Sequence, residues 1–450
     1  MYLMNYVTPT LKLVGDYEHN INNNSKDKKN CIFAFVATSV EVLDESLMPF
    51  CLRSYVSSPN KLVEEFNSWF QRRIMTSKRK QQVDLIENYI FNKNPKILSS
   101  QNIDKIMFAS VTDKYWLSKH NIVITKDEYD KKMIGLNKSL AQGNDEFGNL
   151  CFTQNPYILK NKDFFKTNNN TITFFNSYNY CLGGITNKRW LYNKHKNKLE
   201  LVKQRNEAYG QEPINEIIAT KMLKYFKFPH LPFVEYVFFI DGMELCSKCE
   251  NFIGEKEELV PMSDIVRVLK KNPEHSMYTH VVSCLEFLEI PNASEYIDEM
   301  IIFDRLSLNF DRHLGNFGAI RDVETGQFTR MSPLFDFGSC CFFNYNNEIK
   351  TKDGKNNSRT LLFMERIHEL EEQGKIPKLP ESLIEILKTE LNNYIYTSLD
   401  MDNHIINKML EINSLSNNHK NIDSYIIDTK KDNDIPKEKL LTNEELSRTL

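Results

Sequence analysis

Three oxygen-bearing side chains within residues 304–338 stand at spacings that could support phosphoryl transfer. Asp311 and Asn316 lie five residues apart, and Asp336 follows twenty residues later in an Asp-Phe-Gly triplet. Mg²⁺ prefers hard oxygen ligands such as carboxylates and amides. We therefore predict three catalytic residues: Asn316 and Asp336 as metal ligands, and Asp311 as the group that orients a hydroxyl and accepts its proton.

The catalytic loop of protein kinases, HRDxxxxN, also places its aspartate and asparagine five residues apart. Here the order of the first three residues is inverted to Asp311-Arg312-His313. Residues 317–320 and 327–335 can form a hairpin around residues 324–326, which would return Asp336 to the neighbourhood of Asn316. The alternative is an acidic loop that holds no metal.

Upstream, a glycine pair and a lysine could meet the phosphates of a nucleotide. Residues 182–188 (LGGITNK) are rich in turn formers and precede a short strand that contains Lys203. Glycines let backbone N–H groups approach phosphate oxygens, and a strand lysine can reach the same oxygens. The predicted cofactor-binding residues here are Gly183, Gly184, Lys188 and Lys203. The same residues are also compatible with an ordinary turn, followed by a strand lysine whose side chain faces water.

The elements around Lys203 suggest how it is positioned. A proline-initiated helix with an apolar stripe is predicted from residue 211 to 226, and it places Glu216 where it could meet Lys203. Residues 228–240 and 243–253 predict a strand hairpin. Helices are predicted between residues 261 and 309. A strand-rich half followed by a helix-rich half is the organisation of a two-lobed kinase.

The length, net charge and cysteine content of the chain limit the classes of protein to which it can belong. The chain has 450 residues, enough for two or three domains at roughly 150 residues each. Its net charge of −3 gives no overall basic field, so a nucleic-acid partner is not expected. Nine scattered cysteines are typical of reduced thiols, which favours the cytoplasm. No apolar run is long enough to span a bilayer and the start does not resemble a signal peptide, so we expect no membrane partner.

The predicted fold class is α+β: a two-lobed, protein-kinase-like fold with an additional N-terminal mixed α/β region. The predicted divisions are an accessory domain (1–150), a connector (151–174), the N-lobe (175–260), the C-lobe (261–413) and a polar tail (414–450). In the accessory domain, Tyr115 and Trp116 are expected to pack in a core or between domains. The basic run from Arg72 to Lys80 could contact phosphates, but we favour a solvated face between two helices.

Four segments together resemble the HipA-like family of bacterial serine/threonine kinases. They are GQEPINEIIATKML (210–223), CENFI (249–253), DRHLGNFG (311–318) and PLFDFGS (333–339). The resemblance covers about residues 175–400 and implies a protein-kinase-like fold, ATP and magnesium as cofactors, and transfer to Ser or Thr of a protein substrate, which can be the chain itself.

Carried to this chain, the resemblance also assigns roles to individual residues. It implies that Lys203 binds phosphate with Glu216 as its helix partner, and that the hinge from Glu250 to Phe252 binds adenine through main-chain groups. Asp311 would be the catalytic aspartate, with Asn316 and Asp336 as magnesium ligands. Two neighbouring side chains, Arg312 and His313, would shape the loop and not react.

The chain departs from the family at two places. Gly183 stands where the family often has a serine, which puts autophosphorylation of the glycine loop in doubt. The first 150 residues do not visibly match the N-terminal domain of toxin-type members, so a toxin role and an antitoxin or regulatory partner stay open. Two other functions also stay open: a phosphoinositide-like lipid or small-molecule kinase, and an inactive nucleotide-binding regulatory module.

Overall fold

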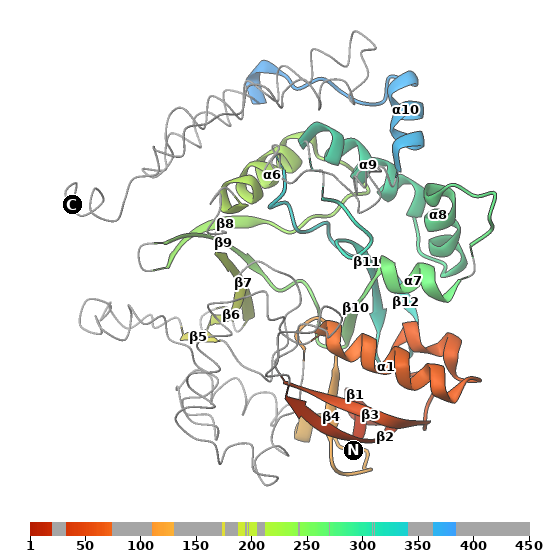
Figure 1. Ribbon diagram of the computed structural model, residues 1–450. Helices are drawn as coiled ribbons and strands as arrows, with labels where there is room; N and C mark the ends of the chain where they lie inside the picture. Colours follow the sequence, from red (N-terminus) through yellow and green to blue (C-terminus); the bar gives the residue numbers. More distant parts are fainter. Residues whose placement is uncertain are drawn as a thin grey trace, which may run out of the picture. The chain divides into compact units, whose positions relative to one another are not determined.

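The computed structural model is drawn in Figure 1. The residues that the structure describes are 1–19, 33–73, 110–129, 173–175, 188–193, 196, 198–204, 212–241, 244–269, 271–307, 309, 311–340 and 363–383. The chain divides into two compact units, Met1–Pro377 and Lys378–Leu450, and every helix and strand below belongs to the first. The predicted tail, 414–450, lies outside the described residues, and the predicted domain boundaries stay predictions.

An antiparallel four-stranded sheet opens the chain, in the order β3-β2-β1-β4. Its strands are β1 (Tyr2–Asn5), β2 (Thr8–His19), β3 (Phe33–Val42) and β4 (Tyr115–Ser118). Leu11, Leu13 and Phe35 are buried on one face, as the two-residue period of a strand requires. At a bulge in β2, a Cβ on Gly15 would lie 2.0 Å from the Val36 carbonyl oxygen, so only glycine fits there.

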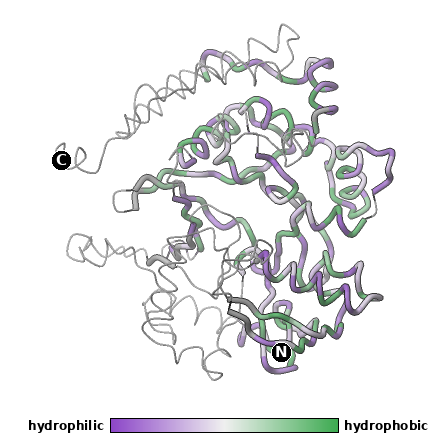
Figure 2. The backbone as a smooth tube through the Cα atoms, in the orientation of Figure 1, coloured by the Kyte–Doolittle hydropathy of each residue, from purple (hydrophilic) through white to green (hydrophobic). Residues whose placement is uncertain are grey.

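The same core includes the 3₁₀ helix η1 (Phe50–Tyr55) and the helix α1 (Pro59–Arg73), which packs on β3. Figure 2 shows hydrophobic and hydrophilic residues interleaved along α1. Phe66 and Phe70 are buried at helical spacing beside Tyr115 of β4. The predicted packing role of Tyr115 and Trp116 is confirmed, because both side chains are buried.

A second antiparallel sheet has five strands in the order β5-β6-β7-β9-β8. The strands are β5 (Thr173–Phe175), β6 (Lys188–Asn193), β7 (Lys198–Gln204), β8 (Tyr236–Asp241) and β9 (Glu244–Glu250). Helix α6 (Glu212–Phe226) packs against β7, β8 and β9. The predicted proline-initiated helix and the predicted hairpin are therefore both present.

The hairpin differs from its prediction at both ends. The strand expected from residue 228 begins only at Tyr236, because Pro229 and Pro232 have no N–H to give to a ladder. Phe233 makes instead an isolated parallel bridge to Leu334. The second strand, expected to reach residue 253, ends at Glu250.

A three-stranded sheet follows, in the order β10-β11-β12. Its strands are β10 (Glu257–Pro261), β11 (Gly318–Asp322) and β12 (Phe328–Met331). Strands β11 and β12 pair antiparallel, which confirms the predicted hairpin around residues 324–326. Gly326 in its turn has a φ of +71°, a value that favours glycine. Residues 311–317, which we name the DRH loop, lead directly into β11.

The residues described after β10 include the helices α7 (Met262–Val268), α8 (Met277–Phe287), α9 (Ala293–Ser307) and α10 (Met364–Glu372). Ser276 caps α8 by accepting a hydrogen bond from the Thr279 N–H. Along α9 the apolar residues Ile297, Met300 and Ile301 are buried, as its sequence pattern predicts. The chain is thus a mixed α/β protein with several antiparallel sheets. Within the described ranges, no helix combines the length and apolarity that a bilayer crossing needs.

Candidate functional site

Lys203 lies at the centre of the five-stranded sheet and is 8% exposed. It stands opposite Lys188 of β6 and opposite Ser247 of β9. Residues directly opposite each other in an antiparallel ladder point to the same face. Lys188, Lys203 and Ser247 therefore share one face of this sheet. Because Lys203 is buried, the alternative in which it faces water is excluded.

Two carboxylates approach the ammonium group of Lys203. Its Nζ lies 2.5 Å from Glu216 Oε1 and 2.9 Å from Asp336 Oδ1. The second oxygen of Glu216 accepts a hydrogen bond from the Ser247 hydroxyl at 2.5 Å. The Lys203 ammonium also lies 5.1 Å from the centre of the Tyr236 ring, within the range of a cation–π contact. The predicted meeting of Lys203 and Glu216 is present, and Asp336 joins it from 133 residues away.

The charges at this meeting point affect the two carboxylates differently. Burial raises the pKa of Glu216, and the nearby Asp336 charge adds to this effect although Lys203 opposes it. The Asp336 side chain is 42% exposed. Its partial burial would raise its pKa, but Lys203 and Lys188 outweigh this effect and hold the pKa well below its usual range. Burial alone would lower the pKa of Lys203, but Asp336 and Glu216 outweigh it and raise that pKa well above its usual value. Asp336 is therefore a carboxylate and Lys203 an ammonium near neutral pH.

The backbone at Asp336 is held in an unusual conformation. Asp336 has a φ of +65°, in the left-handed region that few non-glycine residues adopt. Its N–H points to the Tyr236 hydroxyl oxygen at 3.4 Å. The next residue, Phe337, is fully buried with its ring between those of Tyr236 and Phe303, at centroid distances of 5.9 and 5.7 Å. Such strain persists where surrounding packing over-determines it, and it is concentrated at functional sites.

The DRH loop and the Asp336 segment are joined by one guanidinium. Arg312 is 4% exposed and forms a two-point ion pair with Asp304 of α9, at 2.9 and 3.1 Å. Its Nη1 donates to the carbonyl oxygens of Asn316 at 3.0 Å and Phe335 at 2.7 Å. Arg312 thus fixes the backbone of one predicted metal ligand and of the residue that precedes the other.

Hydrogen bonds within the loop set its remaining geometry. The Asp311 N–H donates to Asn309 Oδ1 at 3.3 Å, and Asn316 Nδ2 donates to the Asp311 carbonyl at 3.3 Å. With Nδ2 used in this way, the oxygen of the Asn316 amide is the atom suited to a metal. His313 Nδ1 accepts the Gly315 N–H at 3.0 Å, so His313 shapes the loop, as expected.

The predicted hinge lies at the end of β9. The Glu250 carboxylate forms ion pairs with Lys196 at 2.5 Å and with Lys198 at 3.1 Å. Its side chain therefore contacts the start of the neighbouring strand β7. The Phe252 ring stacks on Phe335, with centroids 5.7 Å apart. The hinge therefore touches the segment that carries Asp336. Nucleotide binding by Glu250 and Phe252 stays a prediction.

The other three predicted nucleotide-binding residues, Gly183, Gly184 and Lys188, have separate outcomes. Gly183 and Gly184 lie outside the described residues. Lys188, at the start of β6, is brought to Lys203 by strand register, and its charge contributes to the low pKa of Asp336. Sequence reasoning did not find the roles of Ser247, Tyr236 and Asp304. Asp304 had a usable signal, because a carboxylate inside an apolar helix pattern predicts a buried partner.

No family model matches the chain. Over 100 residues the chain is 28% identical to the serine/threonine-protein kinase CtkA of Helicobacter pylori strain J99, and the match covers 21% of this chain and 30% of that protein. The chain resembles the HipA-like kinases. The similarity spans less than a third of the length of that curated relative.

Two solved structures are similar to this chain at low sequence identity. The crystal structure of the Helicobacter pylori proinflammatory kinase CtkA has a TM-score of 0.37 and 18% identity, and covers 55% of this chain and 94% of that one. The HipA chain of a Shewanella oneidensis MR-1 toxin–antitoxin complex with HipB and operator DNA has a TM-score of 0.45 and 11% identity. That match covers 92% of this chain and 96% of that one.

Proposed function

We propose that this protein is an ATP- and magnesium-dependent protein kinase of HipA-like type, with a two-lobed kinase fold, that transfers the γ-phosphate of ATP to Ser or Thr of a protein. The observation that carries the proposal is the position of Lys203, whose ammonium meets Glu216 and Asp336 at 2.5 and 2.9 Å. In protein kinases a strand lysine, a helix glutamate and the Asp-Phe-Gly aspartate must all be in place for transfer.

Each polar group has a part in this chemistry. Lys203, held by Glu216, would bind the phosphates as a fixed positive charge. Asp311 would orient the acceptor hydroxyl and take its proton, while the oxygen of that hydroxyl forms the new bond to phosphorus and ADP leaves. Correct orientation of the acceptor is itself a large part of the catalysis that this site would provide.

The residues present fit a magnesium ion. Asn316 offers an amide oxygen, and Asp336 offers a carboxylate that its lysine neighbours keep ionised. Both are hard oxygen ligands of the kind that magnesium binds together with phosphate oxygens. The ion would supply positive charge to the phosphates during transfer. Arg312 would keep the two ligands in position relative to each other, because it binds the backbone carbonyl oxygens of Asn316 and Phe335.

The proposal extends to partners and location. The family resemblance supports a regulatory protein partner, which could be an antitoxin. The reduced state expected of nine scattered cysteines supports a location in the cytoplasm. The net charge of −3 supports a protein acceptor over a nucleic acid.

The test is transfer of labelled phosphate from Mg-ATP in a cell lysate treated with the purified chain. We expect label on Ser or Thr of proteins, this chain included, identified by mass spectrometry. Asp311→Asn should lose transfer and still bind ATP. Label in the lipid extract would instead indicate the lipid kinase, and ATP binding without any transfer would indicate the inactive module. Full activity of Asp311→Asn would contradict the role given to Asp311.

A further inference from the structure

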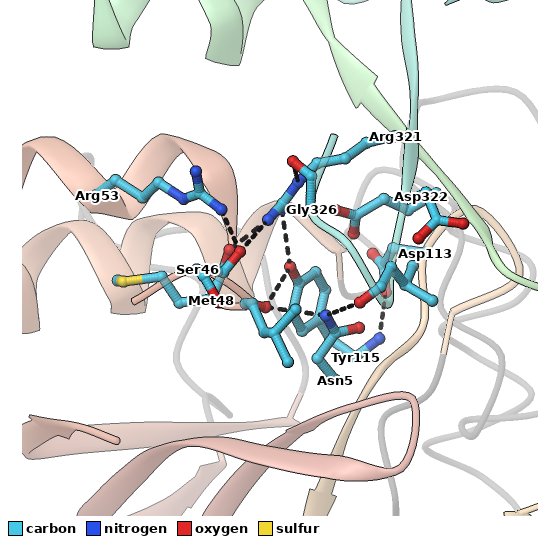
Figure 3. Close-up of polar contacts among 12 residues, drawn as sticks. Asn5, Ser46, Met48, Arg53, Asp113, Tyr115, Arg321, Asp322 and Gly326 are labelled. Atoms are coloured by element: carbon cyan, nitrogen blue, oxygen red, sulfur yellow. Dashed lines mark hydrogen bonds and ion pairs between the residues drawn. The ribbon is translucent and has the colours of Figure 1, made fainter. Parts of the chain in front are cut away.

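A buried arginine joins the N-terminal region, which comprises β1 to β4, η1 and α1, to the strand that follows the DRH loop. Arg321 of β11 has no exposed surface, and Figure 3 shows its guanidinium between the two parts of the chain. It pairs with Glu258 of β10 at 2.8 Å. From the N-terminal side it is met by the carbonyl oxygens of Ser46 at 2.6 Å and Met48 at 3.2 Å. The Tyr115 hydroxyl lies 3.5 Å away.

Two further hydrogen bonds cross this junction, one between backbone groups and one from the Asn5 side chain to Val323. The Leu259 N–H of β10 donates to the Thr112 carbonyl at 2.8 Å. Asn5 Nδ2 donates to the carbonyls of Leu47 at 3.0 Å and Val323 at 3.1 Å. Because these groups are buried or partly buried, separating the two parts would leave them without partners, which is costly. The N-terminal region is therefore fixed to the β10–β11 pair and is not a loosely tethered appendage.

A second connection runs through helix α7. Arg72 at the end of α1 forms an ion pair with Asp264 of α7, with 3.1 Å between Nη2 and Oδ1. The start of α7 in turn holds the DRH loop: the Met262 N–H donates to the Phe317 carbonyl at 2.9 Å, and the Ser263 N–H donates to the Leu314 carbonyl at 2.8 Å. Arg72 is thus connected to the DRH loop through its ion pair with Asp264 and through α7, the helix that carries Asp264.

Both connections lead to the same seven-residue loop. Arg321 holds the strand that continues from its C-terminal end, and α7 accounts for two of its backbone carbonyls. A catalytic group displaced by about 1 Å can lose about 100-fold in rate, so a contact that fixes this loop acts on catalysis without touching the reactants.

We propose that the N-terminal region is a positioning element for the DRH loop, acting through Arg72–Asp264 and through Arg321. The inference rests on the proposed kinase function for its kinetic consequence, but not for its structural one. Arg72 and Arg321 are positioning residues here, because neither contacts the predicted catalytic side chains.

The test uses the full chain with Arg72→Met, which removes the ion pair and leaves every backbone bond of the DRH loop in place. We expect kcat to fall about fivefold and KM for ATP to stay within about twofold. Amide hydrogen exchange in peptides covering residues 311–317 should become faster, while α6 peptides keep their wild-type rates. Arg72→Lys retains a donor toward Asp264 and should recover most of the loss.

The matched control is Lys12→Met, which removes the exposed ion pair between Lys12 and Glu41 on the N-terminal sheet. It should change neither kcat nor exchange in residues 311–317. An active wild type whose Arg72→Met variant keeps both its kcat and its exchange rates would overturn the inference, as would faster exchange limited to α1.

Failure of the proposed function looks different. If the wild type transfers phosphate to no acceptor, the kinase proposal fails, and the exchange measurement still decides the positioning role. Faster exchange in residues 311–317 of Arg72→Met would then support it, and unchanged exchange would overturn it.

Discussion

Lys203 and Asp336 form an ion pair of 2.9 Å although 133 residues separate them in the chain. The pair connects the five-stranded sheet to the segment that follows β12. Glu216 approaches the same ammonium at 2.5 Å, so one lysine organises charges from three elements.

Lys203→Met should abolish most phosphate transfer, because the variant removes the ammonium that contacts both Glu216 and Asp336. Loss of a fixed charge on a reacting group costs about 100-fold or more in kcat. Lys248→Met is the matched control, since Lys248 pairs with Glu200 on the same sheet and contacts neither Glu216 nor Asp336. Steady-state kinetics with Mg-ATP would show the difference, and equal rates for the two variants would contradict the role of Lys203.

The stability of the cluster should depend on pH in a defined direction. The folded pKa of Asp336 lies below its unfolded value of about 3.9, so its contribution is complete above that value and is lost as pH falls toward the folded pKa. The folded pKa of Lys203 is raised, so its contribution is complete below about 10.4 and is lost only at higher pH. Between about pH 5 and 9 the pair should stay charged.

Urea unfolding from pH 6 to pH 3 measures the acid side of this dependence. The free energy of unfolding of the wild type should fall more steeply than that of Asp336→Asn, which lacks the titrating group. Parallel curves would show that Asp336 has an ordinary pKa in the folded state.

Arg312→Met should destabilise the protein strongly. It leaves the Asp304 carboxylate, whose side chain is 11% exposed, without its two-point partner, and removing one member of a buried pair costs about 3–5 kcal/mol. Chemical denaturation gives the loss directly. If the uncompensated charge is the cause, the double variant Asp304→Asn/Arg312→Met should recover part of it, and a further loss would locate the cause in the backbone bonds of Arg312.

Trp190 offers a binding signal that does not require catalysis. It lies two residues after Lys188 on β6, on the face that carries Lys203, and is 4% exposed. Adding Mg-ATP should change its fluorescence, and Trp190→Phe should lose most of the change. The other two tryptophans, Trp69 and Trp116, are buried in the N-terminal region and serve as the internal background. A signal that persists in Trp190→Phe would place the nucleotide elsewhere.

Local pattern predicted a good part of the fold. Apolar residues at helical spacing predicted α6 and α9, and the turn at residues 324–326 predicted the β11–β12 hairpin, because these signals depend on residues close in sequence. The start of β8 was predicted too early, since hydrophobicity alone does not register the missing N–H groups of Pro229 and Pro232.

Some features of the site could likewise be predicted from the sequence, whereas others could not. The spacing of Asp311 and Asn316, the Asp-Phe-Gly triplet and the lysine strand beside a glutamate helix are properties of the sequence alone, and they suffice to predict phosphoryl transfer. The use of Arg312 as a clamp, the strand register that brings Lys188 and Ser247 to Lys203, and the burial of Arg321 beneath the N-terminal region are decided only by the tertiary structure. Each joins groups that are distant along the chain, and a sequence pattern records which groups are available but not which of them packing and desolvation will bring together.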